Sequence, residues 1–171
     1  MMQSLILHPQ CPAGSIVRID AEIEATATGC HVVFVATGDV SQIKVPAVEA
    51  DRGRHDYLWK TTCLEVFWQP AGGTAYREFN LSPSTRWACY DFDDFRSGMR
   101  DAPAVVDIDV SVGPQSLRLE THIESDLPHP ASVALNGIIE GTDGINRFWA
   151  LAFADGAPEF HNDICRAWQM P

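Results

Sequence analysis

The sequence predicts an all-β protein: an antiparallel β-sandwich of two sheets with jelly-roll-like connections. Short runs of alternating apolar and polar residues, each the length of a strand, recur along the chain. Turns rich in Gly, Pro and Ser separate these runs, and no useful stretch has the helical period of about 3.6 residues. The length of 171 residues, with no internal repeat or linker, predicts one domain spanning residues 1–171.

The N-terminal third predicts a hairpin. Ser15 to Glu24 alternates strictly between apolar and polar side chains, which is typical of a strand with one solvated face. After Gly29, residues 30–36 are nearly all apolar and predict a more buried partner strand. A further short strand is expected over residues 42–45. The charged stretch 49–57 predicts a surface loop that walls a binding site.

Three strand-like runs form the centre of the predicted fold. They cover residues 63–68, 75–81 and 85–92, and Gly-, Pro- and Ser-containing turns join them. The stretch from residue 59 to residue 95 holds three of the five tryptophans, and its strands carry polar groups among apolar neighbours. We therefore expect a ligand to bind near this meander, beside the polar and aromatic loop 91–101.

The remaining elements are also strands. Alternation over residues 106–112 and 117–124 predicts a second hairpin with one solvated face. Residues 132–140 and 146–153 predict two more strands joined by a Gly-containing turn, and the C-terminal tail predicts a short edge strand.

Composition excludes several classes of function. The chain has 23 acidic and 12 basic residues, a net charge of −11, which argues against binding to nucleic acid or anionic membranes. No segment is apolar enough to span a bilayer, and the N-terminal residues lack the features of a signal peptide. The five cysteines are scattered and form no metal-binding motif. We expect reduced thiols and a cytoplasmic protein.

Polar residues on the central strands form the candidate site. Glu65 is flanked by apolar residues on a strand with no clearly solvated face, so its carboxylate must be paired or its pKa rises. Glu78 and Asn80 share one face of the next strand. If these strands are neighbours, the three residues can meet an arginine, Arg77 or Arg86. Such a set suits a sugar, and a structural ion-pair network is the alternative.

Aromatic and histidine residues complete the candidate site. Trp59 and Trp87 could stack on a sugar ring. His161 lies in a late loop among carboxylates, and fixing that loop by hydrogen bonds to backbone is the alternative role. No two of the six histidines have metal-ligand spacing. His31 is interpreted as a core residue and His122 as a solvated one.

The central motifs resemble a known family. Trp59 to Phe67, the Tyr-Arg-Glu-Phe-Asn run that starts at Tyr76, and the late Pro-Glu-Phe-His sequence at 158–161 resemble DOMON-like domains related to family-nine carbohydrate-binding modules. The resemblance covers nearly the whole chain and is closest to a bacterial, stand-alone subgroup of unestablished function. It implies a sandwich of two antiparallel sheets. The residues that it implies near the ligand-binding sheet, or on a loop bordering it, are Trp59, Glu65, Asn80, Trp87 and His161.

The resemblance implies two ligand classes. Sugar-binding relatives sandwich the ring between tryptophans, and haem-binding relatives use Met and His as axial ligands, which here implies Met99 with His161 or His129. The leading hypothesis is a non-catalytic module, without a cofactor, for a carbohydrate or a sugar-containing cell-wall compound. The ligand would be a small molecule or an oligosaccharide. The alternatives are a haem-binding cytochrome-like domain, a protein-interaction domain, and a sugar hydrolase that uses Glu65 and Glu78.

Overall fold

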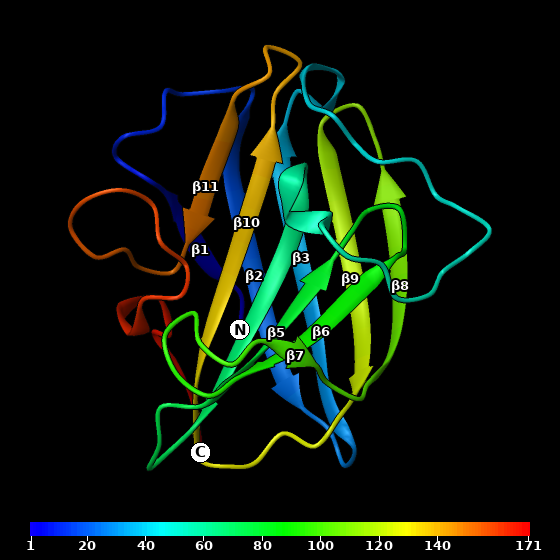
Figure 1. Cartoon of the computed structure of the whole chain (residues 1–171). Coiled ribbons are helices and arrows are strands. Elements are labelled where there is room, and N and C mark those ends of the chain that lie inside the picture. Colours follow the sequence, from blue (N-terminus) through cyan, green and yellow to red (C-terminus); the bar gives the residue numbers. More distant parts are fainter.

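The computed structural model describes all 171 residues and consists of β-strands with three short 3-10 helices (Figure 1). The strands are β1 (Gln3–Leu7), β2 (Ile16–Ala25), β3 (Gly29–Gly38), β4 (Cys63–Pro70), β5 (Tyr76–Leu81), β6 (Trp87–Phe92), β7 (Arg100–Asp101), β8 (Val105–Val112), β9 (Ser116–Glu124), β10 (Ala131–Glu140), β11 (Asn146–Ala150) and β12 (Trp168–Met170). The 3-10 helices are η1 (Val40–Gln42), η2 (Leu58–Lys60) and η3 (Asp163–Cys165). None of these helices has the length and apolar character needed to cross a bilayer.

The strands form one continuous, curled antiparallel sheet. Its hydrogen-bonded order is β7-β6-β5-β4-β10-β11-β1-β2-β3-β9-β8, and β12 also pairs with β10. Strand β1 joins the two halves, because Leu5 pairs with Ile19 of β2 while Leu7 pairs with Trp149 of β11. The all-β antiparallel prediction is therefore confirmed. The expected division into two separate sheets is corrected, since β1 connects them.

The main core lies between the two halves of the curled sheet. The halves approach closely at Gly137 of β10: a methyl group there would lie 3.2 Å from the Leu64 side chain and 3.5 Å from that of Ile19. Leu64 lies on β4 and Ile19 on β2, so this contact spans the interior. Burial of apolar side chains from both halves is the main force that holds the curl. The largest fully buried members of this core include Ile19, Phe34, Leu64, Trp68, Phe79, Leu119 and Leu135.

Two local elements differ from the sequence prediction. The strand expected over residues 42–45 is absent: the Asp39 side chain accepts a hydrogen bond from the Ser41 amide (3.0 Å) and caps η1 instead. Only Ile43 pairs, in an isolated bridge to Gly141. Strand β1 escaped prediction because its five residues are too few to show a clear period.

The outer face of the half formed by β4, β5, β6, β10 and β11 is covered rather than solvated. A second apolar cluster lies on this face, and the segments that carry η2 and η3 pack over it. Its buried aromatic members are Phe67, Tyr76, Tyr90, Phe92 and Phe160. The central strands are thus buried on both faces, as the apolar neighbours of Glu65 predict. The covered face holds the candidate site.

Candidate ligand-binding site

A row of polar side chains crosses the covered face. Glu65 on β4 lies directly opposite Asn136 on β10 and directly opposite Asn80 on β5. Residues that face each other across antiparallel strands project from the same side of the sheet. Glu78 lies two positions before Asn80 and therefore shares that side. All four side chains are buried, with at most 5% of any residue exposed.

The carboxamides in this row are poorly satisfied within the protein. Both side-chain polar atoms of Asn136 and of Asn80 are buried without a hydrogen bond of normal length, although Asn80 lies close enough to Glu78 to lower the pKa of that carboxyl. Buried polar groups are normally paired, because an unsatisfied one costs about 1–3 kcal/mol. Two unsatisfied carboxamides therefore flank the buried carboxyl of Glu65 on this face of the sheet.

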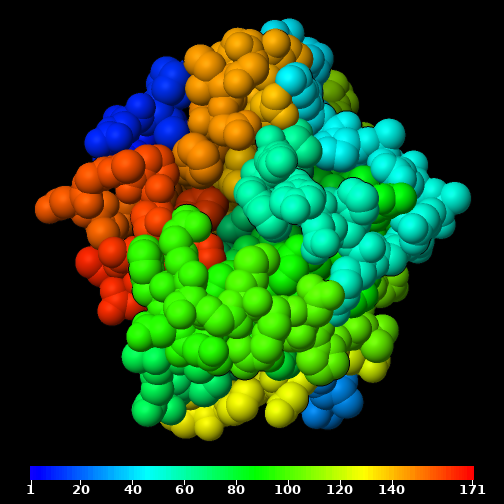
Figure 2. Space-filling model, in the orientation of Figure 1, coloured from blue at the N-terminus to red at the C-terminus, as the bar shows by residue number.

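A cavity of about 690 Å³ opens beside this row, and Glu65 and Glu78 are the members of the row that line it. Its size falls within the usual range for small-molecule sites, about 300–1,000 Å³. Figure 2 shows the corresponding hollow near the centre of the view, bordered by the loop after β6, the loop after β11 and the η2 segment. The lining residues that enter the argument are Trp59, Glu65, Glu78, Arg96, Met99 and His161.

Burial shifts the pKa values of the titratable side chains that line the cavity. Desolvation, followed by the charge of Glu78, raises the pKa of Glu65 well above its ordinary value. Desolvation also raises the pKa of Glu78, to about 7. Burial, with the nearby charge of Arg96, lowers the pKa of His161 to about 4. Burial therefore favours the neutral form of Glu65, whose carboxyl can both donate and accept hydrogen bonds, and His161 is neutral at pH 7.

His161 ties the late loop to the cavity wall. A hydrogen bond joins its Nδ1 atom to the Tyr76 hydroxyl (2.6 Å), and its Nε2 atom lies 3.7 Å from a carboxylate oxygen of Glu78. Its backbone amide donates to Glu159 (3.0 Å), which in turn accepts two hydrogen bonds of 2.9 Å from Arg96. These contacts hold the loop after β6 and the loop after β11 together at the rim of the cavity. They also leave the charge of Arg96 paired with that of Glu159.

Trp59 forms part of the cavity wall. It lies half-buried in η2, and its ring meets that of Tyr90 edge-on at a centroid distance of 6.2 Å. The Tyr90 hydroxyl donates to Asp56 (2.5 Å), which holds the start of this segment against β6. An indole that is half-buried at the wall of a polar cavity has the position needed to stack on a ligand ring.

Trp87, the second expected tryptophan, lies elsewhere. It pairs with Leu81 across β5 and β6 and packs against the main core, on the opposite side from Glu65. The Arg54 guanidinium lies 4.8 Å from the centre of its ring. Strand alternation puts Trp87 on the inner face, so the structure does not bring it together with Trp59.

The arginines expected beside the carboxylates also lie elsewhere. Arg86 precedes β6 and forms an ion pair with Glu49 (2.7 Å) in the preceding loop. Arg77 points away from the cavity and pairs with Asp91 (2.8 Å). The arginine that does line the cavity is Arg96, which sequence reasoning missed because it lies in a loop of irregular structure.

Asn136 was also missed, although the sequence carried a signal for it. It is a single carboxamide in the apolar strand β10, and the reasoning applied to Glu65 applies to it equally. Only the pairing of β10 with β4 reveals that the two residues are neighbours.

The residues at the cavity do not fit a haem. Met99 and His161 both line the cavity, as the haem alternative requires. However, the Nδ1 atom of His161 is hydrogen-bonded to Tyr76, and the Nε2 atom faces the buried carboxyl of Glu78 at 3.7 Å, where a bound iron would meet that carboxyl. The floor also presents Glu65 and Glu78, where a porphyrin would need apolar contacts.

Comparisons with known proteins give a likeness in fold. No protein-family model and no curated protein sequence matches the chain. A solved structure, described as that of a candidate carbohydrate-binding protein from Bacteroides uniformis, superimposes with a TM-score of 0.69. The two chains are 13% identical, and the match covers 96% of this chain and 83% of that one. At this identity, the chain is similar in fold to that protein.

Proposed function

We propose that the protein is a non-catalytic module that binds a neutral carbohydrate, or a sugar-containing cell-wall compound, in the cavity above Glu65. The observation that carries this proposal is the row formed by Asn136, Glu65 and Asn80. Each of these groups offers both a donor and an acceptor when Glu65 is in the neutral form that burial favours. A sugar hydroxyl is also both donor and acceptor, so a ligand that enters the row from the cavity at Glu65 can satisfy it.

The other groups at the cavity favour a neutral ligand. Trp59 supplies an aromatic wall for the apolar face of a sugar ring. Arg96 is already paired with Glu159, and Lys60, the other basic residue at the cavity, lies over the ring of Tyr57. Two buried carboxyls and a net charge of −11 also disfavour anions.

The likeness in fold supports this proposal. The solved structure that superimposes on 96% of this chain is described as a candidate carbohydrate-binding protein. The cytoplasmic location stays a prediction from the sequence.

A glycan array followed by calorimetry tests the proposal. The array identifies a glycan, and calorimetry compares wild-type protein with Glu65→Gln and Glu65→Leu. Glutamine preserves the donor and acceptor of the neutral carboxyl, so its affinity should stay close to wild type. Leucine removes both the donor and the acceptor. We expect the affinity to fall at least about tenfold, which corresponds to the loss of one or more hydrogen bonds between neutral groups. Absence of any bound glycan, or unchanged affinity in Glu65→Leu, would contradict the proposal.

A second candidate, a sugar hydrolase, is favoured by one observation: Glu65 and Glu78 share a covered face and both have raised pKa values. Prolonged incubation with the bound oligosaccharide, followed by mass spectrometry, separates the two functions. Shortened products that the wild type forms and Glu78→Gln does not would show that the protein is a hydrolase and not a binding module. An intact oligosaccharide supports the binding module.

A further inference from the structure

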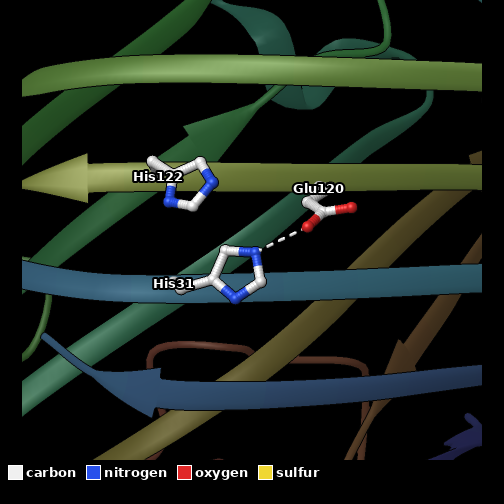
Figure 3. Close-up of side chains that lie close together, drawn as sticks. All are labelled: His31, Glu120 and His122. Atoms are coloured by element: carbon white, nitrogen blue, oxygen red, sulfur yellow. Dashed lines mark hydrogen bonds and ion pairs between the residues drawn. The ribbon is translucent and has the colours of Figure 1, made fainter.

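Two histidines and a glutamate meet on the outer face of the other half of the sheet, away from the cavity. His31 of β3 lies directly opposite His122 of β9, and Glu120 lies two positions before His122 on the same strand. All three side chains therefore project from one side of neighbouring strands. Figure 3 shows the two imidazole rings next to each other, with Glu120 beside His31.

The distances within this cluster are short. The His31 Nε2 atom lies 2.9 Å from an oxygen of Glu120. The two imidazole rings stack with centroids 4.5 Å apart and an angle of 23° between their planes. One nitrogen from each ring and one carboxylate oxygen all lie within 4.8 Å of one another. Arg118 donates to the second oxygen of Glu120 (2.6 Å), which directs the first oxygen toward His31.

We propose that His31, Glu120 and His122 form a binding site for a divalent transition-metal ion of the zinc class. Two imidazoles and a carboxylate are a ligand set that zinc uses in proteins, with bonds of about 2.0–2.2 Å. Donor atoms around such an ion lie about 3.4 Å apart in a tetrahedral arrangement. His122 is exposed and makes no hydrogen bond within the protein, so its ring can rotate to close the remaining gap.

The surrounding charge favours a cation. Glu24 of β2 lies directly opposite His31, and on β8 Asp107 lies opposite His122. Asp109 lies opposite Glu120. These side chains share the outer face with the cluster, where Arg118 pairs with Glu120 and Arg52 lies 3.9 Å from Asp107. Imidazole ligands select zinc-class ions over Mg²⁺ and Ca²⁺, which prefer sites made of oxygen atoms only.

The site is open on its solvent side. Three protein ligands leave at least one position on the ion for water or for a group from another molecule. This arrangement does not depend on the cavity above Glu65, because the cluster lies on the half of the sheet formed by β2, β3, β9 and β8. Experiments on the metal site and on the proposed carbohydrate site can therefore give independent results.

Calorimetric titration of the chelator-treated protein with Zn²⁺ tests the site. We expect one ion per chain in the wild type, and a loss of affinity of at least about tenfold in His31→Ala and in His122→Ala. Glu120→Gln keeps a hydrogen-bonding partner for His31 but removes the charged ligand, so it should also weaken binding. His55→Ala, a change at an exposed histidine outside the cluster, should leave zinc affinity unchanged.

Co²⁺ gives a second readout, because its visible absorption reports on nitrogen and oxygen ligands in low coordination. Wild type should develop this absorption and His122→Ala should not. His122 is exposed, so circular dichroism should show that this variant remains folded. Failure of the wild type to bind Zn²⁺, or wild-type affinity in both histidine variants, would overturn the proposal.

Discussion

The Nε2 atom of His161 lies 3.7 Å from a carboxylate oxygen of Glu78. This pair sits where the late loop meets the sheet, and burial acts on both groups in the direction of the neutral form. The pKa of Glu78 is raised to about 7 and that of His161 is lowered to about 4. Near pH 7, therefore, the group in this pair whose charge changes is the Glu78 carboxyl.

Ligand affinity should consequently depend on pH. A sugar hydroxyl that donates to Glu78 favours the ionised carboxylate, so binding should strengthen as pH rises through the pKa of about 7. The ionised fraction grows about tenfold between pH 6 and pH 8, and we expect a similar gain in affinity. His161 stays neutral over this range. Calorimetry at several pH values measures the effect.

Glu78→Gln provides the control for this prediction. The variant has no titrating carboxyl at this position, so its affinity should be nearly constant from pH 6 to pH 8. A wild-type affinity that is flat over this range, or that falls as pH rises, would show that Glu78 does not accept a hydrogen bond from the ligand.

Trp59 and Trp87 should respond differently to truncation. Trp59→Ala should fold normally and lose at least about tenfold in sugar affinity, because ring stacking contributes about 0.5–1.5 kcal/mol beyond the area that it buries. Trp87→Ala should lower the free energy of unfolding by about 3 kcal/mol and leave the affinity of the folded protein unchanged, since Trp87 packs against the main core. Urea denaturation and calorimetry measure the two quantities. Unfolding of Trp59→Ala would instead identify Trp59 as a core residue.

Asn136→Leu should separate stability from binding. The carboxamide of Asn136 is buried without a partner, so replacing it with an apolar side chain of similar volume removes a desolvation cost. We expect the free energy of unfolding to stay constant or rise by about 1 kcal/mol, while sugar affinity falls. A variant destabilised by more than about 2 kcal/mol would mean that Asn136 has a structural role in the ligand-free protein.

Strand β1 offers a matched pair that tests the join between the two halves of the sheet. Leu5 is buried and pairs with Ile19, whereas its neighbour Ile6 is 49% exposed. Leu5→Ala should lower the free energy of unfolding by about 2–5 kcal/mol, and Ile6→Ala by much less, within about 0.5 kcal/mol. Equal and small effects in urea denaturation would show that β1 contributes little to the fold.

The sequence predicted the elements whose pattern is local. The alternation of Ser15 to Glu24 corresponds to β2, and the buried setting of Glu65 follows from its apolar neighbours. The pairing of Glu65 with Asn80 could also be anticipated, because β4 and β5 are consecutive strands joined by a short turn.

Relationships between distant strands could not be predicted. Asn136 becomes a neighbour of Glu65 only through the pairing of β10 with β4, and His31 meets His122 only through the register of β3 with β9. A single sequence does not specify such registers, because they depend on how the whole sheet curls. Trp87 was assigned to the site as a stacking aromatic residue and by resemblance, although strand alternation places it on the inner face, away from the side that carries Ala88 and Tyr90.

The most direct test of the central proposal is a crystal structure of the protein with the glycan identified by the array. We predict a sugar in the cavity, with hydroxyls within hydrogen-bond distance of Asn136, Glu65 and Asn80 and with a ring against Trp59. A glycan bound on another surface, with Asn80 and Asn136 still lacking partners, would contradict the proposed binding site.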